Sequence, residues 1–126
     1  MERTAPFKEL TAKIIEGCIE VHRILGPGFL ESVYETALAH EFDLRGIKYE
    51  RQKPIPIIYK TILAGEHRLD FLVEGKVVVE LKAIKDFEDI HTAIILSYLK
   101  ATKMEVGLLI NFNKPRLVDG VKRFQY

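Results

Sequence analysis

Several features that mark particular protein classes are scarce or missing in this sequence. Cys18 is the only cysteine, which excludes an internal disulfide and a cysteine-based zinc site and agrees with a reducing cytoplasm. No apolar run approaches the ~18 residues that a membrane span needs. The first residues lack the basic stretch and apolar run of a signal peptide. We therefore expect a cytoplasmic protein.

An excess of charge of one sign is also missing. The chain has 19 basic and 18 acidic residues, so its net charge is +1. This balance leaves no overall basic field to attract nucleic acid, and any such binding would need a local patch. Internal repeats, low-complexity segments and linkers are absent as well. The length of 126 residues therefore predicts one domain over residues 1–126.

Apolar residues at steps of three and four predict three helices, over residues 7–25, Leu30–Arg45 and Asp86–Thr102. Gly26-Pro27-Gly28 should end the first helix and Gly46 the second. The third is apolar over much of its circumference, so we expect it to be well buried.

A period of two predicts strands over residues 47–51 and 54–59, followed by a strand end and turn at 62–65. The prolines at 54 and 56 indicate a sheet edge or a strand start. Val106–Asn111 is a continuous apolar run typical of a central strand, and residues 121–126 could add an edge strand. The order predicts an α/β fold, a mixed sheet flanked by helices.

Three charged side chains interrupt the apolar stretch from Leu69 to Ala83. This stretch has two short β-branched runs around a turn at Glu74-Gly75, which predicts a hairpin. Asp70 lies on the first run, and Glu80 and Lys82 lie on the second. Burying a carboxylate in an apolar sheet costs roughly several kcal/mol unless it is paired or bound to a cation.

The length of the turn decides whether these acids lie together. Glu80 and Lys82 share a face because they are two residues apart in a strand. A two-residue turn would place Asp70 opposite Val79, whereas a three-residue turn or a bulge would place it opposite Glu80. Bulges are common beside active sites, so we expect an odd-length turn or a bulge here.

These residue types suit a Mg²⁺ or Mn²⁺ site. Asp70 and Glu80 supply hard oxygen ligands, and the backbone carbonyl of Leu81 could add another. Lys82 could orient the attacking water and offset the charge that develops at phosphorus. The alternative is a solvated strand face on which Glu80 and Lys82 form a weak surface pair.

Several motifs resemble those of the bacterial and archaeal GxxExxY proteins. Gly28–Tyr34 matches the G-x-x-E-x-x-Y signature, and Asp70, Glu80-Leu81-Lys82, Ser97–Thr102 and Val106–Phe112 follow in the order of that family. The resemblance covers about residues 10–124. The GxxExxY family is placed in the PD-(D/E)XK nuclease-like superfamily, whose restriction-endonuclease-like core is a mixed sheet flanked by helices.

The resemblance implies a Mg²⁺-dependent phosphodiesterase, a nuclease acting on DNA or sometimes RNA. By it, Asp70 and Glu80 bind the metal, Lys82 is the catalytic lysine, and Glu31 joins the metal site through a water. Taken alone, Glu31 is explained by a favourable interaction with the helix dipole. Tyr34 and His91 match characteristic positions, although a buried His is more often a hydrogen-bonded core residue than a ligand.

Two positions depart from the pattern of related proteins. Ile94 stands one helical turn before Tyr98, where relatives often carry Gln, and it cannot hydrogen-bond to water, phosphate or a lysine. Leu69 replaces the usual proline before Asp70. Ile94 and the balanced charge favour an alternative: a catalytically weak or inactive nuclease-like domain that binds nucleic acid or a protein partner. A third hypothesis is a stable domain whose face charges merely pair.

The sequence also suggests how nucleic acid would be bound. A 126-residue unit has a small footprint, so cutting both strands of DNA would favour a homodimer with two-fold symmetry. Seven basic residues could contact phosphates if the fold gathers them: Lys48, Arg51, Lys53, Lys85, Arg116, Lys122 and Arg123.

Overall fold

Two helices open the part of the chain that the computed structural model describes, residues 6–126. They are α1 (Lys8–Leu25) and α2 (Glu31–Arg45). Gly26 follows α1 with φ 70° and Gly46 follows α2 with φ 69°, positive values that glycine adopts without strain. Both predicted helices are therefore confirmed to within one residue at each end.

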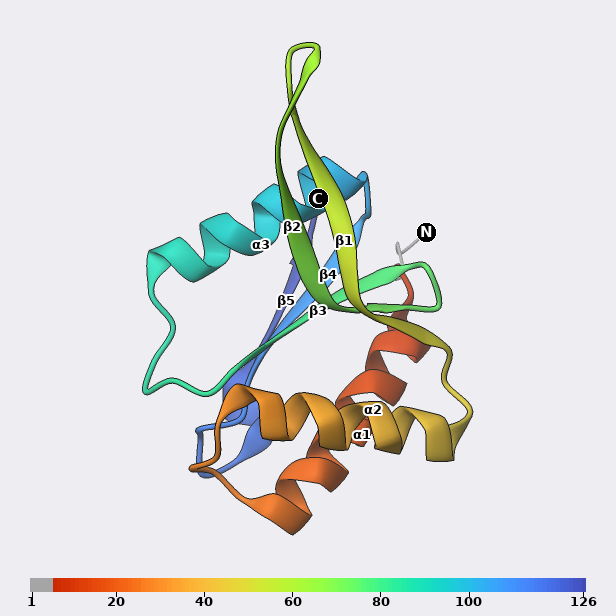
Figure 1. Cartoon of the computed structure of the whole chain (residues 1–126). Helices are drawn as coiled ribbons and strands as arrows, with labels where there is room; N and C mark the ends of the chain where they lie inside the picture. Colours follow the sequence, from red (N-terminus) through yellow and green to blue (C-terminus); the bar gives the residue numbers. More distant parts are fainter. Residues whose placement is uncertain (1–5) are drawn as a thin grey trace, which may run out of the picture.

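A five-stranded mixed sheet follows the two helices (Figure 1). Its spatial order is the chain order, and only β3 and β4 are parallel, joined through α3 (Asp89–Thr102). The 3₁₀ helix η1 (Leu117–Gly120) leads into the last strand. The strands are β1 (Tyr49–Tyr59), β2 (Ile62–Val73), β3 (Val77–Lys82), β4 (Val106–Asn111) and β5 (Val121–Gln125). This is the predicted fold class.

The helices cover the two faces of the sheet through separate apolar clusters. Val77 and Val79 of β3 pack in the cluster formed with α1 and α2, whereas Val78 packs in the cluster that contains Leu99 of α3. β3 is thus apolar on both faces, as a central strand must be. None of the helices in residues 6–126 has the length and apolar composition needed to cross a bilayer.

The turn between β2 and β3 has three residues, as the sequence argument required. Val73 pairs with Val77, which leaves Glu74, Gly75 and Lys76 in the turn. Glu74 and Gly75 both have positive φ, 54° and 65°. The odd number of turn residues places Phe71 opposite Val79. One residue farther from the turn, β2 carries Asp70 and β3 carries Glu80.

The prediction of a strand end and turn at residues 62–65 was wrong. β1 is one long strand, and β2 begins at Ile62, directly after a turn at Lys60-Thr61 in which Lys60 has φ 54°. Gly65 pairs with Ile57, and a register shift follows between Ile57 and Ile58. The glycine thus marks an irregularity inside a hairpin rather than its end. The outer end of this hairpin projects from the sheet (Figure 1).

The expected burial of α3 was also wrong. Only Ile95 and Leu99 are buried, while Ile90 is 57% and Ile94 37% exposed. Nothing in the described chain covers the outer side of this helix, so the apolar side chains of Ile90 and Ile94 on that side face solvent. The helix also begins at Asp89, three residues later than predicted, after the N-cap residue Glu88.

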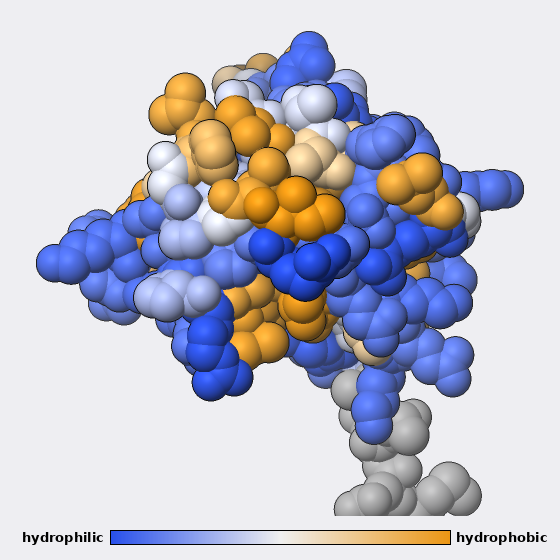
Figure 2. All heavy atoms as spheres, turned by 90° about the horizontal axis from the view of Figure 1, so that it is seen from below, coloured by the Kyte–Doolittle hydropathy of each residue, from blue (hydrophilic) through white to orange (hydrophobic). Residues whose placement is uncertain are grey.

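The underside of the molecule carries apolar side chains among charged ones (Figure 2). The exposed large apolar residues of α1, α2 and the loop between them are Ile19, Ile24, Phe29, Leu30, Val33 and Leu44. Isolated exposed apolar residues are normal on a soluble domain, so this mixed surface by itself indicates no binding site.

Candidate active site

Asp70 and Glu80 meet where β2 and β3 stop pairing. The last paired residues before them are Phe71 and Val79. Beyond this pair, the N–H of Asp70 donates to Oε1 of Glu80 at 3.0 Å, and the N–H of Leu81 donates to Oδ2 of Asp70 at 2.8 Å. Each carboxylate therefore binds the main chain beside the other, and the two acids lie next to one another.

Burial makes this pair of acids hard to ionise fully. Glu80 is only 7% exposed, and Asp70 is partly buried. Loss of solvent raises the pKa of Glu80 to about 8, and the charge of Asp70 adds to the rise. Burial also raises the pKa of Asp70, against the opposing effect of the hydrogen bond from Leu81. The pair therefore retains a proton near neutral pH, which a bound cation would displace.

Lys82 and Glu31 lie beside the acids. The Nζ of Lys82 is 4.0 Å from Oε1 of Glu31, and both side chains are partly exposed. The charge of Lys82 lowers the pKa of both Asp70 and Glu80, but by less than burial raises it. Within residues 6–126 no ion pair joins Lys82 to either acid, so the surface pair between Glu80 and Lys82 is not formed.

A small cavity connects α2 to the acids. It has a volume of about 210 Å³ and is lined by Glu31, Ser32, Glu35, Gln52, Asp70 and Leu81. The structure thus brings together the five residues that the sequence proposed for metal binding and catalysis: Glu31, Asp70, Glu80, Leu81 and Lys82.

Tyr34 lies outside this site. It is fully buried and stacks on Phe112 with ring centroids 4.5 Å apart. Its hydroxyl donates to the carbonyl of Gly26 at 2.6 Å and accepts from the N–H of Phe29 at 3.2 Å. Tyr34 therefore fixes the loop that leads into α2 and Glu31, which is a structural contribution.

His91 also lies apart from the acids, at the start of α3. Its Nδ1 accepts a hydrogen bond from the N–H of Glu88 at 2.8 Å, and its ring lies against Phe87. This is the return bond of a capping box, which satisfies a free N–H at a helix end. The structure gives His91 a capping role.

Tyr98 approaches the site from α3, whereas Ile94 does not. The negative charges of Glu80 and Asp70 add to burial in raising the pKa of Tyr98, and its ring is 5.5 Å from that of His67. Ile94 lines an open apolar groove between α3 and the β1–β2 hairpin, a groove that Tyr98 also lines. The position where relatives often carry Gln therefore supplies no polar group to the acids.

Two polar residues at the site were missed by the sequence analysis. Gln52 donates from Nε2 to Oδ1 of Asp70 at 3.3 Å and also to Oε1 of Glu35. The other oxygen of Glu35 accepts from Nε of Arg51 at 3.0 Å. Glu35 stands four residues after Glu31 on α2, so helical spacing could have found it. Nothing in the sequence distinguishes Gln52.

The fold does not gather the basic residues proposed for phosphate contacts. Arg51 and Lys53 are on β1, while Lys122 and Arg123 are on β5, and these strands are the two opposite edges of the sheet. Arg51 and Lys53 are also paired with Glu35 and with Glu50. The seven residues therefore do not form a single basic surface.

The donor set of the site fits a cation that is held partly by its substrate. Among residues 6–126, no group of three or more His, Cys, Asp or Glu side chains is placed to hold a metal ion. Mg²⁺ commonly uses one or two carboxylates and leaves its other positions to waters and phosphate oxygens. Asp70 and Glu80 supply that number of carboxylates.

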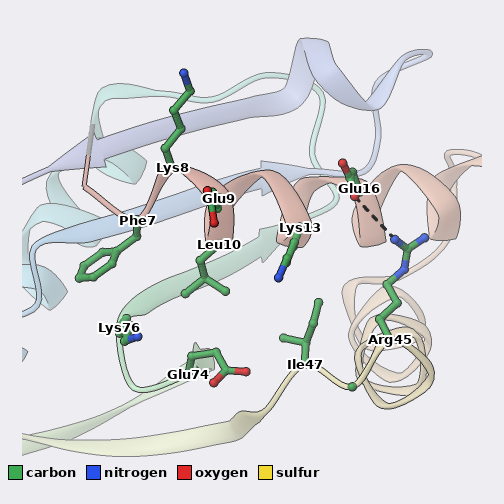
Figure 3. A pocket seen from close by; sticks show the side chains of 11 residues that line it. Phe7, Lys8, Glu9, Leu10, Lys13, Glu16, Arg45, Ile47, Glu74 and Lys76 are labelled. Atoms are coloured by element: carbon green, nitrogen blue, oxygen red, sulfur yellow. Dashed lines mark ion pairs between the residues drawn. The ribbon is translucent and has the colours of Figure 1, made fainter. Parts of the chain in front are cut away.

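A larger cavity, of about 860 Å³, lies elsewhere, between α1, the end of α2 and the β2–β3 turn (Figure 3). Its charged residues have both signs, and Glu16 and Arg45 lie 4.0 Å apart across it. It contains none of the residues that meet at Asp70 and Glu80. Cavity volume therefore does not point to the candidate site, which we choose for its two buried acids.

Comparison with known families agrees with this geometry. The family model described as the PD-(D/E)XK nuclease superfamily matches residues 8–124. Searches of curated proteins and of solved structures gave no match. The mixed sheet with helices on both faces is consistent with this superfamily, whose nucleases generally use divalent metals. The chain therefore belongs to the PD-(D/E)XK nuclease superfamily.

Proposed function

We propose that this protein is a nuclease that hydrolyses phosphodiester bonds of DNA with bound Mg²⁺ or Mn²⁺, and that it belongs to the GxxExxY family. The observation that carries the proposal is the meeting of Asp70 and Glu80, two acids that share a partly buried site. Membership of the superfamily supports nucleic acid as the substrate. The Gly28–Tyr34 signature supports the narrower family.

Asp70 and Glu80 would hold the metal ion, with the backbone carbonyl of Leu81 as a further oxygen and Glu31 acting through a water. A bound divalent cation lowers the pKa of a water ligand and polarises a phosphoryl oxygen. The two acids would lose the proton that they otherwise retain, because proton and cation compete for the same carboxylates. This couples metal binding to pH.

Lys82 would act on the attacking water and on the charge that develops at phosphorus. Its ammonium group is partly exposed and lies 4.0 Å from Glu31. Because no ion pair within residues 6–126 holds it closer than this, it can turn toward a phosphate beside the acids. A positioned cation at this point stabilises a crowded, negatively charged transition state.

A second copy of the chain is the partner that we propose for cutting both strands. The outer end of the β1–β2 hairpin projects from the sheet (Figure 1) and exposes Ile58, Tyr59, Ile62 and Leu63 at 54–65%. An apolar groove of about 600 Å³ lies between this hairpin and α3. Insertion of each hairpin end into the groove of the other copy would bury both surfaces in a two-fold dimer.

The alternative is a nuclease-like domain that binds nucleic acid or a protein without cutting. The apolar side chain of Ile94 and the separation of basic residues between the two sheet edges favour it. This alternative predicts that nucleic acid or a protein partner is bound and that no nucleic acid is hydrolysed, whichever divalent metal ion is added.

A cleavage assay separates the two proposals. Wild type, Asp70→Asn and Glu80→Gln are incubated with single- and double-stranded DNA and RNA in Mg²⁺, Mn²⁺ or EDTA. We expect wild type to cut DNA only with metal, and both variants to lose about 10²–10³-fold in rate. Binding without cutting would favour the alternative. Equal cutting by wild type and both variants would indicate a contaminant and contradict the nuclease.

A further inference from the structure

We infer that Gln52 is a positioning residue for Asp70, kept in an unfavourable backbone conformation because its amide orients that carboxylate for metal binding. This inference rests on the proposed function. It concerns a residue that binds no metal itself and acts through Asp70.

The backbone at Gln52 is unusual. β1 pairs with β2 at Arg51–Phe71 and at Lys53–Leu69 in one register, so Gln52 lies opposite Asp70, but these two residues are not themselves paired. Its φ is 52°, in the left-handed region that glycine and asparagine adopt readily and most other residues avoid. A chain selected only for a stable hairpin would favour Gly or Asn here.

The side chain gives a reason for this conformation. Nε2 of Gln52 donates to Oδ1 of Asp70 at 3.3 Å, while Oδ2 of the same carboxylate accepts from the N–H of Leu81 at 2.8 Å. Both oxygens of Asp70 are thus held from different strands. A carboxylate fixed at both oxygens has a defined orientation before any cation arrives, which lowers the entropy cost of binding.

Gln52 is itself fixed by a chain of contacts from α2. It also donates to Oε1 of Glu35, and Oε2 of Glu35 accepts from Nε of Arg51 at 3.0 Å. Arg51 donates in addition to Oγ1 of Thr36 at 3.0 Å. The amide lies between two acids, Glu35 and Asp70, whose charges repel one another. It therefore separates these acids and connects α2 to the site.

Two substitutions separate this role from a merely structural one. Gln52→Gly removes the amide and relieves the backbone strain, whereas Gln52→Met removes the amide and keeps the strain and the side-chain length. Mn²⁺ affinity is measured by calorimetry and the melting temperature by thermal unfolding. We expect both variants to lose about tenfold in Mn²⁺ affinity, although Gln52→Gly should melt about 2–5 °C above Gln52→Met.

Lys60→Gly is the matched control. Lys60 has φ 54°, nearly the same as Gln52, but lies in the turn of the projecting hairpin. This variant should melt at a higher temperature than wild type and bind Mn²⁺ with unchanged affinity. The deficit of Gln52→Gly in DNA cleavage should also shrink at high Mn²⁺ concentration, because excess cation compensates weak binding.

The outcomes distinguish this inference from the proposed function. If wild type and both Gln52 variants bind Mn²⁺ equally, or if affinity follows melting temperature across the variants, the positioning role is wrong and the nuclease proposal stands. If wild type binds no Mn²⁺, the proposed function and this inference both fail. If Gln52→Met does not fold, the comparison of Gln52→Gly with Lys60→Gly decides.

Discussion

The N–H of Asp70 donates a hydrogen bond to Oε1 of Glu80 at 3.0 Å, one residue beyond the last pair of β2 and β3, Phe71 and Val79. The N–H of Leu81 in turn donates to Asp70. These bonds offset part of the desolvation of the two carboxylates, and the pair retains a proton for the rest. We propose that a divalent cation replaces this proton when it binds to the two acids.

Stability without metal should fall as pH rises, because Glu80 holds its proton more strongly in the folded state. The pKa of Glu80 rises from 4.5 to about 8 on folding. Between these values the folded chain binds more protons than the unfolded chain, so the free energy of unfolding decreases with pH. Chemical denaturation in EDTA between pH 5 and 9 should show a loss of about a few kcal/mol.

Glu80→Gln supplies the control for this pH dependence. The neutral amide cannot titrate, so the variant should lose less stability over the same range of pH. Parallel pH curves for wild type and Glu80→Gln would contradict the raised pKa.

Lys82 should matter for the reaction and not for metal binding. Replacing Lys82 by Met removes the cation beside the phosphate position, and we expect DNA cleavage to slow about 10²-fold at saturating substrate. Mn²⁺ affinity should stay the same or increase, since a positive charge near the acids is lost. Lys76→Met, in the β2–β3 turn, is the control and should cut normally. If Lys82→Met weakens Mn²⁺ binding but leaves the cleavage rate unchanged, the proposed role of Lys82 in the reaction is wrong.

The projecting hairpin should control the oligomeric state. Leu63 is 65% exposed at the hairpin end, and Leu63→Lys would place a charge in the proposed apolar contact. Light scattering should give twice the chain mass of 14.5 kDa for wild type and a single chain for this variant. Ile24→Lys, equally exposed on α1, should remain dimeric. A wild-type monomer at all concentrations would exclude the dimer.

Tyr34→Phe tests the structural role of the signature tyrosine. The variant loses the hydroxyl that bonds Gly26 and Phe29 in the core, and we expect a loss of about 1–2 kcal/mol in the free energy of unfolding. Mn²⁺ affinity should not change, because Tyr34 does not contact the acids. Urea denaturation and calorimetry together check both expectations; unchanged stability with weakened Mn²⁺ binding would give Tyr34 a place in the site.

Periodicity was sufficient for the elements that bury one clear face. The spacing in α1 and α2 was recognised because each packs on one apolar cluster. The apolar run of β4 was recognised because all six of its residues are buried. The helix of α3 was also predicted, but its exposed side and the turn of the β1–β2 hairpin were not, since apolar residues in both face solvent. A hydrophobic pattern indicates which side chains prefer burial, but it cannot show that the rest of the chain fails to cover them.

The acids of the site could be found from the sequence for a physical reason. Asp70 and Glu80 lie in an otherwise apolar hairpin, so their desolvation had to be compensated. The odd number of turn residues was expected because bulges are common beside active sites, and the turn has three residues. Gln52 could not be found, because its position depends on a left-handed residue inside a strand that no sequence pattern marks. Glu31 needed the family resemblance, since any acid in a first helical turn has a simpler explanation.

A calorimetric titration of Mn²⁺ into wild type and Asp70→Asn at pH 6 and pH 8 tests the central claim most directly. We predict that wild type binds one ion per chain. Binding should be tighter at pH 8, because the acids are protonated in a smaller fraction of molecules at that pH. Asp70→Asn should bind Mn²⁺ at least tenfold more weakly. No binding by wild type, or equal affinity in both proteins, would contradict the assignment of the two acids to a metal site.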